Sequence, residues 1–178
     1  MIRSAKISDD GAYRYRLDRV WDEGPLVVWA MLNPSTADGE TDDPTLRRVL
    51  AFSHGWGFGG LVVVNLFAYR ASKPTTLRYV DDPVGPGNVE AVSTAVGVSE
   101  LVVCAWGAGV DLPALRDRKG TDIAAIAGGW GVPMACLGRT EKGRPVHPLY
   151  VAAGAKPIPY GPGRIGELQL PRDRARAE

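Results

Sequence analysis

Short apolar runs alternate with amphipathic segments along most of the chain. Three runs, at residues 27–32, 61–66 and 101–106, have little polar interruption and are too short for a typical helix. A fourth run covers residues 132–137. Runs of this length that are rich in Val, Leu and Ala indicate strands buried on both faces, as the strands of a parallel sheet are.

Helices are predicted between these strands. Asp43 followed by Pro44 is typical of an N-cap and first helical residue, which predicts a helix that ends near residue 55. A second predicted helix covers residues 89–96 with Asn88 as its N-cap, and a third covers about residues 121–127. Strands and helices thus alternate, which predicts a three-layer α/β/α fold around a central four-stranded, mainly parallel sheet.

The N-terminal segment has a different pattern. Apolar and charged residues alternate from Tyr13 to Asp18, the period of a half-exposed strand at a sheet edge or in an N-terminal hairpin. The chain of 178 residues has the length of one ordinary domain. We assign residues 1–165 to a single α/β domain, and we predict that the charged stretch 166–178 is a flexible tail.

Composition narrows the class of protein. No run of about 18 apolar residues exists that could span a bilayer, and the N-terminus lacks the apolar region of a secretory signal. Cys104 and Cys136 both lie in apolar runs, so we expect a soluble protein in a reducing cytoplasm. Two histidines and two cysteines cannot supply a four-cysteine cluster or a zinc site without carboxylates, so we predict neither a metal nor another cofactor.

Polar side chains gather where the predicted strands end. Asn33 and Ser35 follow the first strand with Asp38 close behind, Asn65 ends the second strand, and His147 lies in the loop after the fourth. Ligand sites of parallel sheets lie at the carboxyl ends of the strands, so we expect these side chains around one pocket. Taken singly, the same residue types are ordinary turn and capping residues.

These residue types suit cleavage of an N-glycosidic bond. The reaction builds positive charge on the sugar and negative charge on the departing base, so it needs a positioned water and a donor toward the base. Asn33, assisted by Asp38, could hold the water, and His147 could donate to the base. Asn65 offers one donor and one acceptor to the Watson–Crick edge of an extruded base.

An aromatic platform and phosphate contacts are expected beside such a base. Phe52, Phe67 and Trp106 are candidates for the stacking aromatic, although aromatic residues beside a sheet are more often part of the core. Arg139, Lys142 and Arg144 stand in one loop and are expected to contact DNA phosphates. The formal net charge is only +1, so any DNA affinity depends on a local cluster of this kind.

Taken in order, these motifs resemble the uracil-DNA glycosylase superfamily. The resemblance lies in Asn33-Pro34-Ser35 after the first strand, Asn65 after the second, and His147-Pro148 in the late loop. More narrowly, the motifs NPSTAD, DDPT, NLFAYRA, AWG, CLG and HPLY resemble domain-of-unknown-function family 1643, which occurs in bacterial and phage genomes. The superfamily resemblance implies a glycosylase-like fold and a DNA glycosylase that excises an altered pyrimidine from single- or double-stranded DNA. We expect it to act as a monomer.

Three departures from the superfamily motifs leave other functions open. Met31 occupies a motif position that is glycine in the superfamily, Leu149 replaces a serine, and Asn33 replaces the carboxylate of the strongest water activators. The second hypothesis is therefore a binder of a modified base or nucleotide, without cleavage or with different chemistry, in DNA modification or phage defence. A third is a thiol enzyme that uses Cys136 with His147, but a cysteine inside an apolar strand is usually inert.

Overall fold

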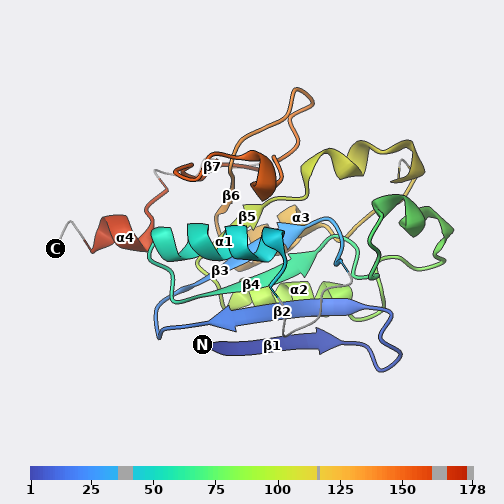
Figure 1. Cartoon of the computed structure of the whole chain (residues 1–178), viewed down its shortest axis with the longest axis horizontal. Coiled ribbons are helices and arrows are strands. Elements are labelled where there is room, and N and C mark those ends of the chain that lie inside the picture. The colour runs from blue at the N-terminus through green and yellow to red at the C-terminus, as the bar shows by residue number, and fades with distance from the viewer. Residues whose placement is uncertain (36–41, 116, 162–167, 176–178) are drawn as a thin grey trace.

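A seven-stranded mixed sheet organises the molecule, with strand order β1-β2-β4-β3-β5-β6-β7 (Figure 1). The computed structural model describes residues 1–35, 42–115, 117–161 and 168–175. Within them the strands are β1 (Ile2–Ile7), β2 (Arg14–Val20), β3 (Leu26–Met31), β4 (Gly60–Asn65), β5 (Leu101–Cys104), β6 (Met134–Cys136) and β7 (Ile158–Pro159). The four central strands β4, β3, β5 and β6 run parallel and coincide with the four predicted apolar runs.

The prediction of four strands is wrong for the sheet as a whole. β1 and β2 form an antiparallel hairpin, β2 pairs with β4, and β7 pairs with β6. These additions cover the edges of the parallel strands, whose backbone N–H and C=O groups would otherwise lack partners. β2 therefore lies inside the sheet, and β1 is an edge strand.

β2 keeps the alternation of a half-exposed strand, and a buried arginine occupies one of its inward positions, in phase with Tyr15 and Leu17. Arg19 is fully buried, and its guanidinium donates to Asp42 Oδ1 from Nε (3.0 Å) and Nη2 (2.9 Å). A buried cation is tolerated when a carboxylate meets it in this way. Charged positions of a strand can therefore face inward.

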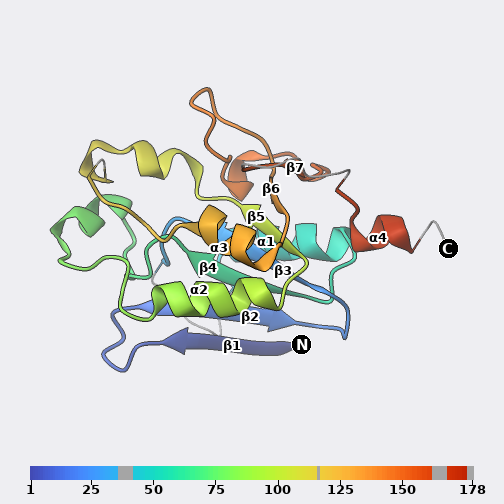
Figure 2. The same ribbon diagram turned by 180° about the vertical axis from the view of Figure 1, so that it is seen from behind.

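Helices cover both faces of the sheet. α1 (Pro44–Gly55) packs on one face, and α2 (Asn88–Gly97) and α3 (Ile123–Trp130) pack on the other (Figures 1 and 2). Short helices complete the connections: η1 (Pro74–Tyr79), η2 (Gly107–Asp111), η3 (Pro113–Leu115), η4 (Pro148–Tyr150) and α4 (Pro171–Arg174). Among the described residues, none of these helices is both long and apolar enough to span a bilayer.

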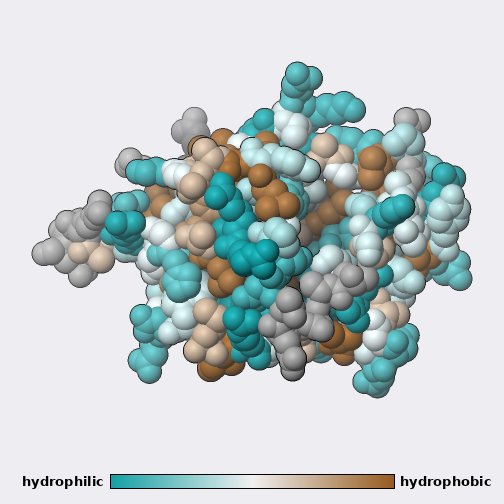
Figure 3. All heavy atoms as spheres, in the orientation of Figure 1, coloured by the Kyte–Doolittle hydropathy of each residue, from teal (hydrophilic) through white to brown (hydrophobic). Residues whose placement is uncertain are grey.

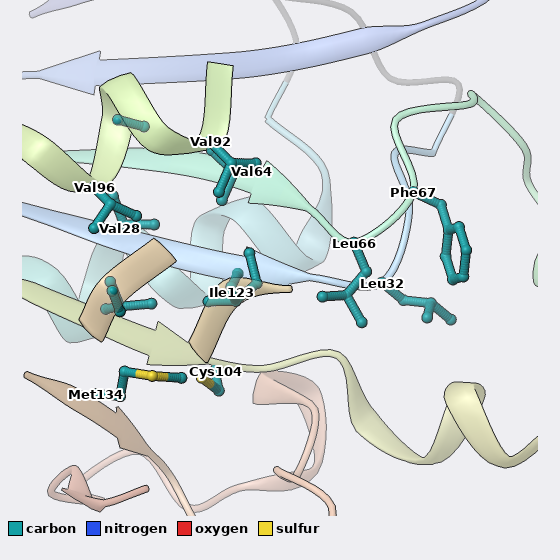
Figure 4. Packing of buried hydrophobic residues seen from close by; sticks show 14 of the residues in the cluster. Val28, Leu32, Val64, Leu66, Phe67, Val92, Val96, Cys104, Ile123 and Met134 are labelled. Atoms are coloured by element: carbon teal, nitrogen blue, oxygen red, sulfur yellow. The ribbon is translucent and has the colours of Figure 1, made fainter. Parts of the chain in front are cut away.

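Two hydrophobic core clusters follow from the alternation of side chains along the strands. On the α1 face, Trp29 packs with Phe52 and Trp56. On the other face, side chains such as Val28 and Val64 pack against α2 and α3 (Figure 4). Burial of both faces accounts for the uninterrupted apolar runs of the central strands.

The two predicted N-caps have different outcomes. Asp43 caps α1 as predicted, because its carboxylate accepts a hydrogen bond from Leu46 N at 2.7 Å. Asn88 does not cap α2; it is the first helical residue, and Gly87 precedes it without a side-chain cap. The Asn88 amide is instead buried and bonded to other segments, so tertiary contacts outweigh local capping at this position.

The C-terminal segment that the structure describes lies against α1. Leu170 is buried in the core cluster on that face, and Arg172 N donates to Trp56 O at 3.0 Å. The predicted boundary between domain and tail at residue 165 falls within 162–167, outside the described residues. That boundary stays a prediction.

Candidate functional site

A pocket of about 170 Å³ lies at the carboxyl ends of β3 and β4, on the α1 face of the sheet. It brings together Asn33, Ser35, Asn65 and His147, four of the predicted site residues. We call it the front pocket; it belongs to the face drawn in Figure 3, where the surface is hollowed beside the N-terminal end of α1. Pockets for drug-sized ligands usually measure roughly 300–1,000 Å³, so this one suits a smaller group such as a single base.

Asn65 is the most unusual side chain of the front pocket. It is the last residue of β4 and is 1% exposed, and among the described residues neither Oδ1 nor Nδ2 has a hydrogen-bond partner. Its backbone carbonyl accepts from Asn88 Nδ2 at 2.9 Å, so the main chain is held in place. A buried amide without partners destabilises a fold, and such groups usually have a functional reason. A ligand that offers one acceptor and one donor side by side would satisfy both atoms.

Asn33 is anchored through its amino group. Asn33 Nδ2 donates to Ala71 O at 2.8 Å and to Pro34 O at 3.0 Å. Ala71 N in turn donates to Pro34 O, so the loop after β3 is tied to the segment after β4. The side-chain group of Asn33 that remains for a ligand is Oδ1, which can accept a hydrogen bond from water.

His147 enters the front pocket from the loop after β6. Its Nδ1 accepts from Leu149 N at 3.4 Å at the start of η4, so the neutral ring carries its proton on Nε2. Burial lowers the pKa of His147, and the negative charge of Asp43 partly opposes this. The ring is therefore a neutral Nε2–H donor at pH 7.

Two contacts fix the position of the His147 loop. Arg48 of α1 donates to the carbonyls of Pro148 (3.4 Å) and Val151, which holds η4 against α1. Gly107 has φ +69°, and a Cβ built there would lie 3.3 Å from His147 Cβ. Glycine thus serves both the left-handed backbone and the close approach of the histidine.

The structure adds Asp43 and Arg14 to the front pocket. Asp43 accepts from Ser35 Oγ at 3.2 Å through Oδ2, in addition to its capping bond. Arg14 is 7% exposed; burial lowers its pKa to about 10, and Asp43 is the main opposing charge. Arg14 therefore stays a cation at neutral pH, and the pocket holds charges of both signs.

Sequence reasoning missed both residues for different reasons. Asp43 lies in the sequence within reach of the loop that carries Asn33 and Ser35, but its position before Pro44 has a sufficient explanation as an N-cap, so no role in the pocket is assigned to it. Arg14 alternates with apolar neighbours just as Arg16 does, and no signal in the sequence distinguishes the buried arginine from the more exposed one. Asp38, the predicted partner of Asn33, lies outside the described residues.

The remaining predicted residues do not line the front pocket. Phe67 is 2% exposed and belongs to the core cluster on the α2 and α3 face (Figure 4), so its ring cannot stack on a base there. The reason is its backbone: Phe67 N donates to Leu32 O at 3.0 Å, which fixes the turn after β4. Trp106, Arg139 and Arg144 line a second, larger cavity, and Lys142 is exposed on the same loop.

Neither cysteine is placed for thiol chemistry. Cys104 and Cys136 are fully buried neighbours in β5 and β6, and burial raises the pKa of Cys104. Within the described ranges, no group of three or more His, Cys, Asp or Glu side chains is arranged to hold a metal ion. The front pocket itself presents amide, imidazole, carboxylate and guanidinium groups.

Comparison with known proteins gives one result. The family model described as "Protein of unknown function (DUF1643)" matches residues 14–149, which cover most of the chain and every described residue named for the front pocket. The chain therefore belongs to this family. Neither a search of curated proteins nor a search of solved structures found a match.

Proposed function

We propose that this member of the DUF1643 family binds an extruded, altered pyrimidine base in the front pocket and cleaves its N-glycosidic bond. The observation that carries the proposal is Asn65, whose Oδ1 and Nδ2 are buried in the pocket and have no hydrogen-bond partner in the part of the chain that the structure describes. A pyrimidine edge has a donor beside an acceptor, which complements the two amide atoms. The resemblance of Asn33-Pro34-Ser35, Asn65 and His147-Pro148 to the uracil-DNA glycosylase superfamily points to the same reaction.

The residues of the front pocket supply the groups that this reaction requires. Asn33 Oδ1 accepts a hydrogen bond from the attacking water, whose oxygen bonds to C1′ of the sugar. The bond between C1′ and the base nitrogen breaks, and its electron pair leaves with the base. His147 donates from Nε2 to the base oxygen that gains negative charge. Asp43 is the carboxylate that can take the proton released by the water.

A second candidate function is recognition of an altered base without cleavage. Its support is the bonding of Asp43, whose Oδ1 accepts from Leu46 N and whose Oδ2 accepts from Ser35 Oγ. Both oxygens of Asp43 are therefore already engaged, which leaves less hydrogen-bonding capacity for an attacking water. Under this alternative, Asn65 still selects the base, and the sugar stays attached.

Release of a free base tests the proposal. The protein is incubated with single- and double-stranded oligonucleotides that carry uracil, hydroxymethylated pyrimidines or other altered pyrimidines, and released bases are identified by mass spectrometry. The expected result is one released base and an alkali-sensitive break at its position. The Asn65→Leu variant is the matched control, because it keeps the side chain's approximate shape and removes both polar atoms. Selective binding without any released base would support the second candidate, and absence of both would overturn the proposal.

A further inference from the structure

A second cavity, of about 500 Å³, lies on the opposite face of the sheet from the front pocket. Its walls come from the segment after β5, the loop after β6, the start of α3, and the residues after β7; α3, β6 and β7 can be followed in Figure 2. We call it the rear cavity. Its lining includes two aromatic residues, Trp106 and Tyr160, and two arginines, Arg139 and Arg144.

The rear cavity and the front pocket adjoin at the carboxyl end of the sheet. Asn65 lines the front pocket, and the next residue, Leu66, lines the rear cavity. Asn88 connects the two sides, since its Nδ2 donates to Asn65 O (2.9 Å) and to Thr121 Oγ1 (2.8 Å), and Thr121 lines the rear cavity.

Two aromatic rings give the rear cavity a stacking surface. The Trp106 and Tyr160 rings meet edge to face, with centroids 5.8 Å apart and planes at 76°. Both residues are only half-buried, in contrast to Phe67 and Trp29 in the cores. Half-exposed rings at a cavity wall can accept the face of a planar heterocycle.

Two guanidinium groups stand beside these rings. The Arg139 guanidinium lies over the Tyr160 ring at 5.2 Å from its centroid, and its Nη2 donates to Pro159 O at 3.1 Å. Arg144 donates to Asp111 Oδ1 from Nε (3.1 Å) and Nη2 (3.0 Å). Both bonds use one edge of the Arg144 group, and its Nη1 makes no hydrogen bond to the described residues.

The backbone sets the spacing of the two arginines. Arg139 forms an isolated β-bridge with Pro145, and Thr140 N donates to Arg144 O at 2.8 Å. The loop from 139 to 145 is thus a closed turn rather than an extended basic segment. Lys142 sits at its tip, is exposed, and does not line the cavity.

We propose that the rear cavity binds a nucleotide, with the base against Trp106 and Tyr160 and the phosphate at Arg139 and Arg144. Planar guanidinium groups match phosphate oxygens, and aromatic faces stack on any base. A volume of about 500 Å³ also falls in the usual range of roughly 300–1,000 Å³ for small-molecule sites. The nucleotide is either free or a unit of a single DNA strand, and this inference does not depend on cleavage in the front pocket.

Calorimetric titration and the indole N–H signal of Trp106 in NMR spectra test the proposal. The probes are a deoxynucleoside 5′-monophosphate, the same nucleoside without phosphate, and a short single-stranded oligonucleotide. We expect saturable binding of at least one phosphate-bearing probe, a shift of the Trp106 signal, and weaker binding of the nucleoside. Arg139→Ala and Arg144→Ala should each weaken binding about tenfold, on the scale of one lost charge-assisted contact.

Lys142→Ala is the matched control, because it removes one cation from the same loop outside the cavity; it should change affinity less than about twofold. Trp106→Phe keeps a stacking ring and should retain binding, whereas Trp106→Ala should lose it, with melting temperatures measured for both. Preference for the oligonucleotide over the monophosphate assigns the site to a DNA strand, and the reverse preference assigns it to a free nucleotide. The proposal is overturned if neither phosphate-bearing probe binds at millimolar concentration, or if Lys142→Ala weakens binding as much as Arg139→Ala does.

Discussion

The front pocket and the rear cavity use polar groups in opposite ways. In the front pocket, Asn65 is buried and its amide atoms lack hydrogen-bond partners among the described residues, which destabilises the folded state. In the rear cavity, Arg139 and Arg144 are exposed and already bonded to Pro159 O and Asp111. Buried groups without partners discriminate strongly between ligands, because a wrong ligand leaves them unsatisfied. Exposed, bonded groups add modest and salt-dependent affinity.

The largest expected effect comes from His147 in the front pocket. His147→Ala should slow base release in single turnover by roughly 10²–10³, the scale for losing one preorganised donor to a developing anion. DNA affinity should change little.

The protein's other histidine gives the control for this comparison. His54 stacks on Trp21 with ring centroids 3.8 Å apart and does not line the front pocket, so His54→Ala should leave the rate unchanged. Equal rates of base release for His147→Ala and His54→Ala would show that His147 does not take part in the reaction.

The second effect concerns stability and has an unusual sign. Asn65→Leu should raise the free energy of unfolding by about 1–3 kcal/mol, because it removes buried polar atoms that lack partners. The same variant should lose base selectivity. Urea denaturation measures the free energy of unfolding, and the oligonucleotide panel measures the base selectivity.

Asn88→Leu is the matched variant for Asn65→Leu. Asn88 is also a buried asparagine, but its Nδ2 bonds Asn65 O and Thr121 Oγ1, so this substitution should destabilise the fold. If Asn65→Leu is as destabilising as Asn88→Leu, the amide of Asn65 has a structural role and the contrast between the two sites fails.

A third prediction uses the lowered pKa of His147. Burial places the pKa of His147 below its unfolded value of 6.5, so the unfolded state binds a proton first on acidification. This residue's contribution to stability is complete above pH 6.5 and is lost as the pH falls through the folded pKa. The wild-type protein should therefore lose more stability between pH 7 and pH 5 than His147→Asn.

Asp43 can be tested with the same histidine signal. Asp43→Asn keeps a good N-cap residue but removes the charge that raises the pKa of His147. NMR titration of the His147 ring should show a further lowered pKa, with little change in melting temperature. An unchanged pKa would mean that Asp43 does not act electrostatically on the front pocket.

The smallest effect is expected from the basic loop. Affinity for a single-stranded oligonucleotide should fall with salt, and each lost phosphate contact should flatten the slope of log K against log salt by about 0.7. Arg139→Ala combined with Arg144→Ala should flatten it, and Lys142→Ala alone should not. Equal flattening by Lys142→Ala alone would contradict the assignment of the phosphate contacts to the rear cavity.

Local signals allowed much of this architecture to be predicted. Uninterrupted apolar runs marked the four parallel strands, and the Asp43-Pro44 pair marked the start of α1. Parallel strands bring their carboxyl ends to one edge, so Asn33, Asn65 and His147 converge on one pocket even though they are far apart in sequence. The direction of the strands alone is enough to predict that these three residues lie close together.

Side-chain direction and non-local pairing could not be predicted in the same way. Neighbouring residues at a strand end point to opposite faces, so a shift of one residue decides which cavity a side chain lines. Whether Arg14 lines the front pocket and Trp106 the rear cavity depends on the face of the sheet to which each side chain points. The pairing of β2 with β4 joins segments more than forty residues apart, and no local pattern specifies it.

The anchoring of η4 by Arg48 has a consequence for protein engineering. Arg48 bonds the main-chain carbonyls of Pro148 and Val151, groups that every amino acid carries. The side chains of Leu149 and Tyr150 are exposed and take no part in that attachment. A library that randomises positions 149 and 150 can therefore keep η4 attached to α1. Because the Tyr150 ring lies 5.9 Å from the His147 ring between centroids, position 150 is a practical place to change the surroundings of His147.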